Sequence, residues 1–190
     1  AISGSGSVTS NYNGSQLSCA TSTDGQITVS ASGGTGTLTY SIDGGTYQSS
    51  AVFSSLAAGT HSLNVKDANG CVQSLSSVTI TAPSAISGSG SVTSNYNGSQ
   101  LSCATSTDGQ ITVSASGGTG TFTYSIDGGT YQSSAVFSSL AAGTHSLNVK
   151  DANGCVKSLS SVTITAPSAI SGSRSEEHTS ELQSPDHLVC

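Results

Sequence analysis

Residues 24–45 read DGQITVSASGGTGTLTYSIDGG, the clearest strand pattern in the chain. Apolar and small polar side chains alternate on both sides of the segment GGTG, which is the period-2 pattern of a β-strand with one buried face. The glycines between the two runs, and the Asp-Gly-Gly that follows the second run, predict turns because these residues adopt turn conformations at little cost. The stretch therefore predicts two strands connected by tight turns.

Outward from this stretch the pattern continues. Shorter alternating runs lie around Val8 and residues 52–53, 63–65 and 78–80. Asn69-Gly70 predicts a type I′ hairpin turn, in which both central residues have positive φ. Pro83 has no amide hydrogen to donate to a sheet and marks a domain boundary. About seven short strands with one apolar face each predict an antiparallel β-sandwich of immunoglobulin-like type.

The chain repeats itself. The segment AISGSGSVTSNYNGSQLSCATSTDGQ begins at Ala1 and again at Ala85, and AISGS returns at Ala169, which sets a period of 84 residues. A unit of this length is a small domain rather than one turn of a solenoid. We therefore expect an all-β chain with two tandem immunoglobulin-like sandwich domains and the start of a third copy, at residues 1–84, 85–168 and 169–173.

Two substitutions separate the copies. Leu38 is replaced by Phe122, and Gln73 is replaced by Lys157. An apolar exchange is typical of an inward position whose packing can adjust, whereas a Gln/Lys exchange is typical of a solvated one.

The last residues depart from the repeat. Residues 174–184 read RSEEHTSELQS, which resembles the in-frame translation of a sequencing adapter. We therefore expect residues 174–190 to be a non-native tail outside the fold. The first residue is in phase with the repeat and is not Met, as expected of a fragment.

Composition excludes several function classes. Without the tail, three Lys residues and six Asp residues give the two copies a net charge of −3. Nucleic-acid binding needs clustered basic side chains, and these lysines are isolated from one another, so we expect no nucleic-acid partner. No apolar run approaches the roughly 20 residues that span a bilayer, so we expect no membrane insertion of this segment.

The cysteines predict an oxidising compartment. Each copy carries two, Cys19 with Cys71 and Cys103 with Cys155, without the close spacing of a metal site. Pairing within each copy is the favoured arrangement because each domain then folds alone, and closing such a loop stabilises it by about 4 kcal/mol on the chain-entropy model. The competing pair Cys71–Cys103, which would connect neighbouring copies, stays open.

A family resemblance rests on DGQITVSASGGTGTLTYSIDGG and FSSLAAGTHSLNVKDANGC in residues 24–71, which recur in 108–155 with Phe122 in place of Leu38. These strings resemble the SprB-type repeat of gliding-motility adhesins in Bacteroidota. The resemblance implies a secreted or cell-surface protein, associated with the outer membrane, whose tandem β-sandwich repeats serve adhesion or gliding. One departure is His61 and its counterpart His145, where members commonly have Tyr.

No residue pattern predicts an enzyme, a cofactor or a metal site. His61 is the sole His of its copy and has no nucleophile motif beside it. The glycines Gly4 and Gly6 lack the third glycine of a dinucleotide loop, so we interpret them as a flexible strand or linker. Asp24, Asp43 and Asp67 lie at predicted turns, where Asp commonly caps backbone amides, and calcium would need six to eight converging oxygens.

The leading functional hypothesis is a stalk or spacer that also forms a multivalent adhesive array. Its partner would be an extracellular polymer such as a glycan, or another surface protein. A carbohydrate-binding module is one alternative, with Tyr12 and Tyr47 as the plausible exposed aromatic platforms. Accessory repeats of a larger secreted enzyme are another.

Overall fold

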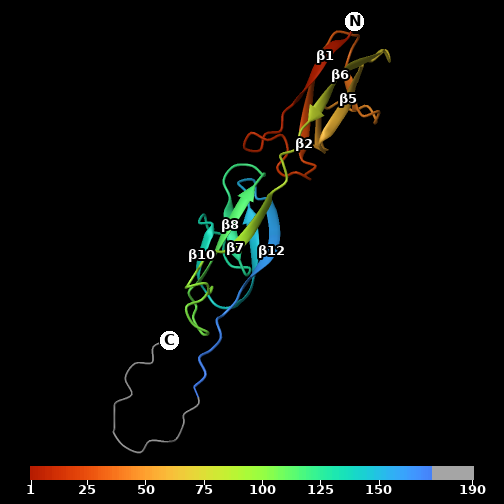
Figure 1. Cartoon of the computed structure of the whole chain (residues 1–190). Coiled ribbons are helices and arrows are strands. Elements are labelled where there is room, and N and C mark those ends of the chain that lie inside the picture. Colours follow the sequence, from red (N-terminus) through yellow and green to blue (C-terminus); the bar gives the residue numbers. More distant parts are fainter. Residues whose placement is uncertain (173–190) are drawn as a thin grey trace, which may run out of the picture. The chain divides into compact units, whose positions relative to one another are not determined.

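Each copy folds into six β-strands in the computed structural model, which describes residues 1–172 (Figure 1). The strands of the first copy are β1 (Ser3–Val8), β2 (Gly25–Ser32), β3 (Thr39–Ile42), β4 (Val52–Leu56), β5 (Gly59–Lys66) and β6 (Val72–Ile80). Those of the second copy are β7 (Ser87–Val92), β8 (Gly109–Ser116), β9 (Thr123–Ile126), β10 (Val136–Leu140), β11 (Gly143–Lys150) and β12 (Val156–Ile164). The described residues contain no helix, and six strands form each copy where about seven were expected.

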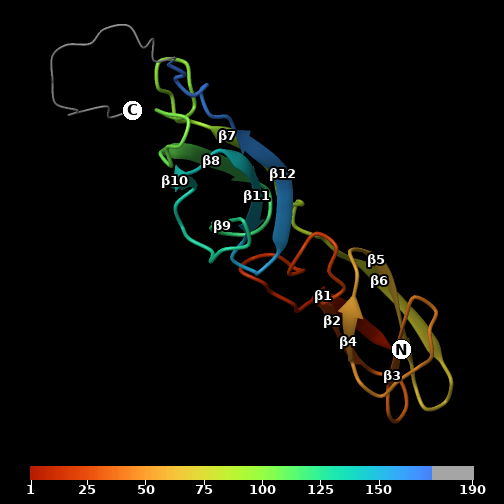
Figure 2. The ribbon, with the colours of Figure 1, turned by 90° about the horizontal axis from the view of Figure 1, so that it is seen from below.

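The strand order confirms the immunoglobulin-like sandwich. In the first copy one sheet has the order β1-β2-β4 and the other the order β3-β5-β6, and the second copy repeats both. Every neighbouring pair whose register is known is antiparallel. Immunoglobulin strands A, B and E pair in one sheet and C, F and G in the other, so the present fold is this arrangement without strand D. Figure 2 shows the strands of the second copy around their common interior.

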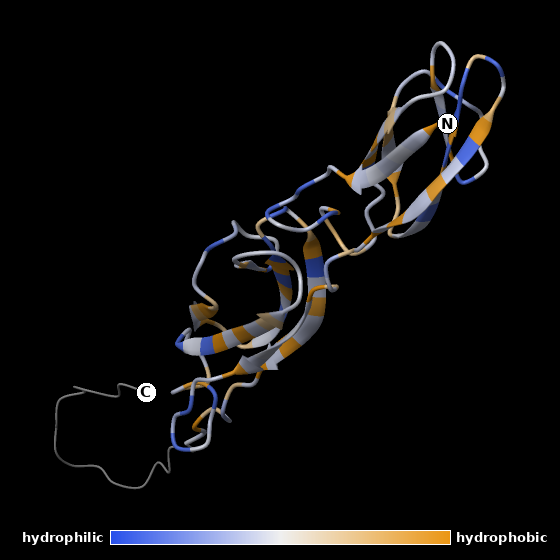
Figure 3. Cartoon of the chain, turned by 90° about the horizontal axis from the view of Figure 1, so that it is seen from above, coloured by the Kyte–Doolittle hydropathy of each residue, from blue (hydrophilic) through white to orange (hydrophobic). Residues whose placement is uncertain are grey.

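The alternating side chains form the core, as the pattern predicts. Ile27 and Val29 of β2 and Leu63 and Val65 of β5 are at most 4% exposed. Figure 3 shows the alternation as apolar and polar bands along the strands. Full burial of one such side chain stabilises the fold by about 1.5–3 kcal/mol. The sandwich therefore rests on a small aliphatic core.

The two differing positions behave as their chemistry predicts. Leu38 packs against the core of the first copy and is partly buried, as is Phe122 in the second. Gln73 and Lys157 are both exposed.

Strand β1 decides between the two interpretations of the glycines at the start of the copy. Gly6 lies opposite Val29 in a regular antiparallel ladder, so the glycine-rich start is a strand and no linker. A Cβ on Gly6 would collide with Leu63 and come within 3.0 Å of Val78. Glycine is needed here because the opposite sheet leaves no room for a side chain.

The hairpin between β5 and β6 corrects an expectation. Gly70 has a φ of 84°, but Asn69 is not among the residues with positive φ. The amide of Gly70 donates to the Asp67 carbonyl at 3.0 Å, and the amide of Asp67 donates to the Cys71 carbonyl at 3.0 Å. A type I turn followed by a left-handed glycine has this form, and it replaces the type I′ turn expected from Asn-Gly.

Two compact units divide the described chain. The first holds Ala1–Ser87 together with Ala115–Phe122 and Val149–Lys157, so it contains the first copy and two turns of the second. The other unit holds the remaining strands of the second copy. The site described next lies entirely within the first unit.

Candidate functional site

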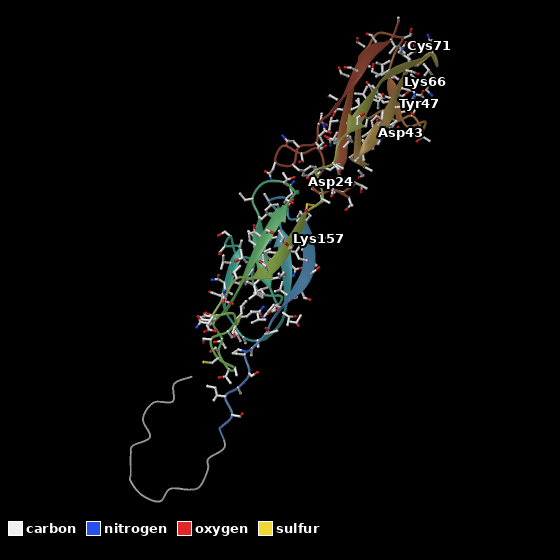
Figure 4. The ribbon with its side chains drawn as sticks, viewed as in Figure 1. Asp24, Asp43, Tyr47, Lys66, Cys71 and Lys157 are labelled. Carbon is white, nitrogen blue, oxygen red and sulfur yellow. A yellow bond between two sulfur atoms is a disulfide. The ribbon has the colours of Figure 1, made fainter. Side chains whose placement is uncertain are left out.

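The first copy has two chemically different ends. At one end, which we call the amino pole, the turns 33–36 and 67–71 lie together: a Cβ on Gly34 would come within 3.0 Å of Asp67, and one on Gly36 within 2.9 Å of Ala68. At the other end, the carboxyl pole, the loop 11–24 folds over the sheet ends. Figure 4 shows Cys71 at one end and Asp24 at the other.

Asp67 holds the amino pole together. Its Oδ1 accepts hydrogen bonds from the amides of Asn69 at 3.0 Å and Cys71 at 2.9 Å, and its Oδ2 accepts one from Thr35 at 3.0 Å. The hydrogen bond from the Cys71 amide, with those from Thr35 and Asn69, lowers the pKa of Asp67 against the opposing effect of burial. The carboxylate therefore presents Cys71 on a fixed turn. Asp151 repeats the arrangement in the second copy.

Leu17 anchors the loop of the carboxyl pole. It is fully buried, and a Cβ on Gly25 would come within 2.9 Å of it and within 2.8 Å of Ile80. The amide of Ser18 donates to Asp24 Oδ1 at 3.2 Å, and the hydroxyl of Tyr12 donates to the Asp24 carbonyl at 3.0 Å. The loop is thus pinned at its middle and at its end.

Cys19 lies on the half-buried part of this loop. Its amide donates to the hydroxyl of Ser22 at 3.2 Å, and its carbonyl accepts from the Ser22 amide at 3.1 Å. The Ser22 hydroxyl also lies 2.7 Å from that of Ser18. These bonds close a small turn with the sulfur of Cys19 at its edge.

The disulfide of the first unit joins Cys19 to Cys155, with the two Cα atoms 5.8 Å apart. The expected bonds Cys19–Cys71 and Cys103–Cys155 are therefore wrong. Cys71 is a free, exposed cysteine, which also excludes the pair Cys71–Cys103. Cys103 is itself disulfide-bonded.

The physical reason is the length of the sandwich. Cys19 and Cys71 lie at opposite poles, and the eight residues of β5 run from one pole to the other. At about 3.3 Å per residue this strand spans roughly 26 Å. A disulfide needs Cα atoms within about 7 Å, so no bond can form within a folded copy.

A set of hydrogen bonds surrounds the disulfide, and we call it the polar clasp. Asn153 donates from Nδ2 to the carbonyls of Ser18 at 3.0 Å and Tyr12 at 3.3 Å, and its Oδ1 accepts from Asn13 Nδ2 at 2.6 Å. A further contact of 3.1 Å joins the hydroxyls of Ser15 and Thr119. The clasp orients the loop 11–24 and the turn of Cys155 toward each other, independently of the covalent bond.

His61 forms an ion pair with Asp43. Its Nδ1 lies 2.7 Å from Asp43 Oδ2, and its Nε2 lies 3.2 Å from the carbonyl of Ala57. Burial alone lowers the pKa of His61, but the hydrogen bonds to Asp43 and Ala57 and the Asp43 charge raise it above its usual value. Because both nitrogens face acceptors, neither is available to take a proton from a nucleophile. His145 and Asp127 repeat the pair.

The turn aspartates cap backbone amides, as the sequence predicts. Asp24 binds the amide of Ser18, Asp43 that of Ser62, and Asp67 those of its own turn. Each carboxylate lies at a separate turn. Among residues 1–172 no group of three His, Cys, Asp or Glu side chains converges in a way that holds a metal ion.

The two tyrosines proposed as a platform are not brought together. Tyr12 lies at the carboxyl pole, where its hydroxyl binds Asp24. Tyr47 lies beside β5, and the Nζ of Lys66 stands 4.1 Å from the centre of its ring (Figure 4). A cation already covers that aromatic face. Tyr12 and Tyr47 therefore do not form one row of open rings.

Family comparison identifies the repeated unit. A model of the SprB repeat matches residues 11–47 and 95–131, which carry the pinned loop, β2 with β3, and the equivalent parts of the second copy. Two tandem segments of the chain thus match the SprB repeat. Each matched segment of the SprB repeat includes the loop cysteine, Cys19 or Cys103, whereas the turns of Cys71 and Cys155 lie outside it.

Solved structures resemble the two SprB repeats at low identity. One is the C-terminal 282-residue fragment of intimin in complex with the intimin-binding domain of its translocated receptor: identity is 16%, the TM-score is 0.35, and the match covers 85% of this chain and 64% of that fragment. Another comprises fibronectin(III)-like modules of Clostridium thermocellum CbhA, with 14% identity, a TM-score of 0.31, and 84% and 93% coverage. The chain thus spans about two thirds of the intimin fragment. A search of curated proteins found no match.

The described part of the chain was also searched for membrane spans. Residues 1–172 contain no helix that is long and apolar enough to cross a bilayer.

Proposed function

We propose that this chain is a repeat segment of a secreted or cell-surface adhesin, in which the SprB repeats act as a load-bearing stalk and present a multivalent array. SprB repeats occur in surface adhesins, so an adhesin-type repeat at the cell surface is the coarse function. The stalk role, the link to gliding and the association with the outer membrane belong to the proposal.

The observation that carries the proposal is the bond Cys19–Cys155 with its polar clasp. A stalk under tension must transmit force along its length without unfolding its domains. The disulfide bypasses the residues between two cysteines that are 136 positions apart, so pulling on the chain ends cannot extend the segment from β2 to β11, and only β1 and β12 lie outside it. A catalytic domain has no such need.

Two further parts of the proposal concern boundaries and chemistry. We propose residues 1–84 and 85–168 as the repeat domains, supported by their identical strand sets and by Pro83 between β6 and β7. We also propose that the domains have no enzymatic role, supported by the engagement of both His61 nitrogens. The partner would be a surface protein or an extracellular polymer met by many weak contacts.

Pulling single molecules by their ends tests the stalk. An extended chain spans at most about 3.6 Å per residue, so each reduced copy should release roughly 30 nm when it unfolds. In oxidised molecules we expect these long releases to disappear, and they should return in Cys19→Ser, with Cys71→Ser as the matched control that keeps the oxidised behaviour. Long releases in oxidised wild-type molecules would contradict a load-bearing role.

Beads tethered through this chain test the adhesive array. We expect retention on mucin-coated or polysaccharide-coated surfaces to rise more steeply than in proportion to copy number as two, four and eight copies are compared. A bead that carries an unrelated β-sandwich protein is the control. If retention equals that of the control at every copy number, the adhesive part of the proposal is wrong and only the stalk part stands.

A further inference from the structure

The free cysteine of the first copy lies on a surface whose counterpart is occupied. Thr35, Asn69 and Cys71 are all exposed at the amino pole of the first copy. The residues one period later are Thr119, Asn153 and Cys155, and each is more buried, with Thr119 8% exposed. These three residues contact the loop 11–24 through the clasp and the disulfide.

The unoccupied surface has the same geometry as the occupied one. Asp67 accepts from the amides of Thr35, Asn69 and Cys71 at 2.9–3.0 Å, and Asp151 accepts from those of Thr119, Asn153 and Cys155 over the same 2.9–3.0 Å range. Because the carboxylate fixes the turn with or without a partner, the surface is formed before anything binds to it.

We propose that the amino pole formed by Thr35, Asn69 and Cys71 is a docking and disulfide-forming site for the carboxyl-pole loop of another repeat of this type. The occupant is a loop with the sequence of residues 11–24: its carbonyls accept from Asn69, its serine hydroxyl meets Thr35, and its cysteine bonds to Cys71. Every repeat thus carries a donor loop at one pole and an acceptor turn at the other.

The polarity of the repeat makes this a head-to-tail system. The acceptor turns lie beside the start of each copy, since a Cβ on Gly34 would come within 2.9 Å of Ile2. The donor loop lies beside the end of the copy, where the amide of Thr81 donates to Gln16 Oε1 at 2.6 Å. A heterologous contact of this kind joins the end of one repeat to the start of the next, and it requires no residue beyond the repeat itself. The site stands on this geometry and is independent of what the array adheres to.

Bond formation needs an oxidant of the disulfide class. Two thiols, one on Cys71 and one on the docked loop, lose two protons and two electrons to a disulfide donor, which leaves as two thiols. In a test this donor is oxidised glutathione. Two molecules of reduced glutathione are released for each bond formed.

The test extends the full chain at its amino end by one further copy of residues 1–84. After refolding with glutathione, thiols are alkylated with N-ethylmaleimide and located by mass spectrometry of unreduced tryptic peptides. In the original chain we expect Cys71 to be alkylated. In the extended chain we expect Cys71 to be at least tenfold less alkylated, and the exposed cysteine of the added copy to carry the label instead.

A matched variant separates docking from a folding fault. Replacing the loop cysteine of the added copy with Ser should restore alkylation of Cys71, while the far-ultraviolet circular dichroism of the array stays that of folded sheets. If Cys71 is alkylated equally in the original and extended chains, although the bond Cys19–Cys155 forms in both, the acceptor site is refuted. That result would leave the load-bearing test of the existing disulfide untouched.

Discussion

The amino poles of the two copies have the same sequence, but their cysteines are in different states. In the first copy Cys71 is free and exposed, and in the second Cys155 is bonded and half-buried. The cores show no such contrast: Ile27 and Ile111 are both fully buried, as are Leu17 and Leu101. The state of a pole is therefore set by the loop that meets it, whereas the state of the core is set by the copy's own sequence. Changes at the poles should affect the two copies unequally, and changes in the core should affect them equally.

The largest unequal effect is expected at the cysteines. For a separation of 136 residues the chain-entropy model predicts that the Cys19–Cys155 bond stabilises the fold by about 5 kcal/mol. Cys155→Ser should lower the total free energy of unfolding in guanidinium by several kcal/mol. Cys71→Ser, at the same position of the other copy, should change it by less than about 0.5 kcal/mol because the side chain is exposed and unbonded.

Core substitutions should lower the stability of both copies by the same, intermediate amount. Gly6→Ala and Gly90→Ala each place a methyl group against a leucine of the opposite sheet, Leu63 or Leu147. Overpacking of this kind costs about 1–3 kcal/mol, and the two variants should agree within error. Ser5→Ala, on the exposed side of the same strand, is the control. A large difference between the two glycine variants would show that the copies are not equivalent inside.

The clasp predicts a smaller and unequal effect. Asn153→Ala removes hydrogen bonds to Ser18, Tyr12 and Asn13, and a lost hydrogen bond costs about 0.5–1.5 kcal/mol. We expect a loss of roughly 1–2 kcal/mol in reducing buffer, where the disulfide cannot mask it. Asn69→Ala removes no such side-chain bond, so it should leave the free energy of unfolding unchanged in the same denaturation experiment. Equal losses in both variants would mean that Asn153 acts only within its own turn.

The smallest effect is a pH dependence common to both copies. The pKa of His61 is raised, so its ion pair stabilises the fold fully below the unfolded pKa of about 6.5, and this stabilisation is lost as pH rises through the folded pKa. The hydrogen bond from His61 lowers the pKa of Asp43, and the corresponding stabilisation is lost as pH falls through that value. Since Asp43 is half exposed, each pair contributes at most about 1 kcal/mol.

The double variant His61→Gln and His145→Gln checks this sign. Its unfolding free energy should be lower than that of the wild type at pH 5.5, and the difference should shrink by pH 8.5. A difference that grows with pH would contradict the assigned ion pairs.

Sequence reasoning recovered the sandwich because its evidence is local. The alternation around Ile27 and Leu63 depends only on each strand having one buried face, and the structure buries both residues. Leu17 was missed, although it is fully buried, because it lies in an irregular loop with no period to reveal it. Gly6 was left open between strand and linker because a glycine required by close packing resembles, in the sequence, a glycine that gives flexibility.

The disulfide of the candidate site could not be predicted from the sequence, for a different reason. Which cysteines meet depends on the end of the sandwich where each one lies, and that follows from strand length and order rather than from spacing along the chain. Once β5 is known to connect the poles, a bond between Cys19 and Cys71 is excluded, and a bond between copies follows. The prediction of a type I′ turn at Asn69-Gly70 was wrong for a related reason. The side chain of Asp67 binds two amides of the turn and selects another conformation.

One peptide decides the central claim. Trypsin cuts after Lys66, Lys150 and Lys157, which releases the seven-residue peptide DANGCVK with Cys155 from the oxidised, denatured chain. We expect mass spectrometry without reduction to find this peptide disulfide-linked to residues 1–66, which contain Cys19. Linkage to residues 67–150, which contain Cys71 and Cys103, would contradict it.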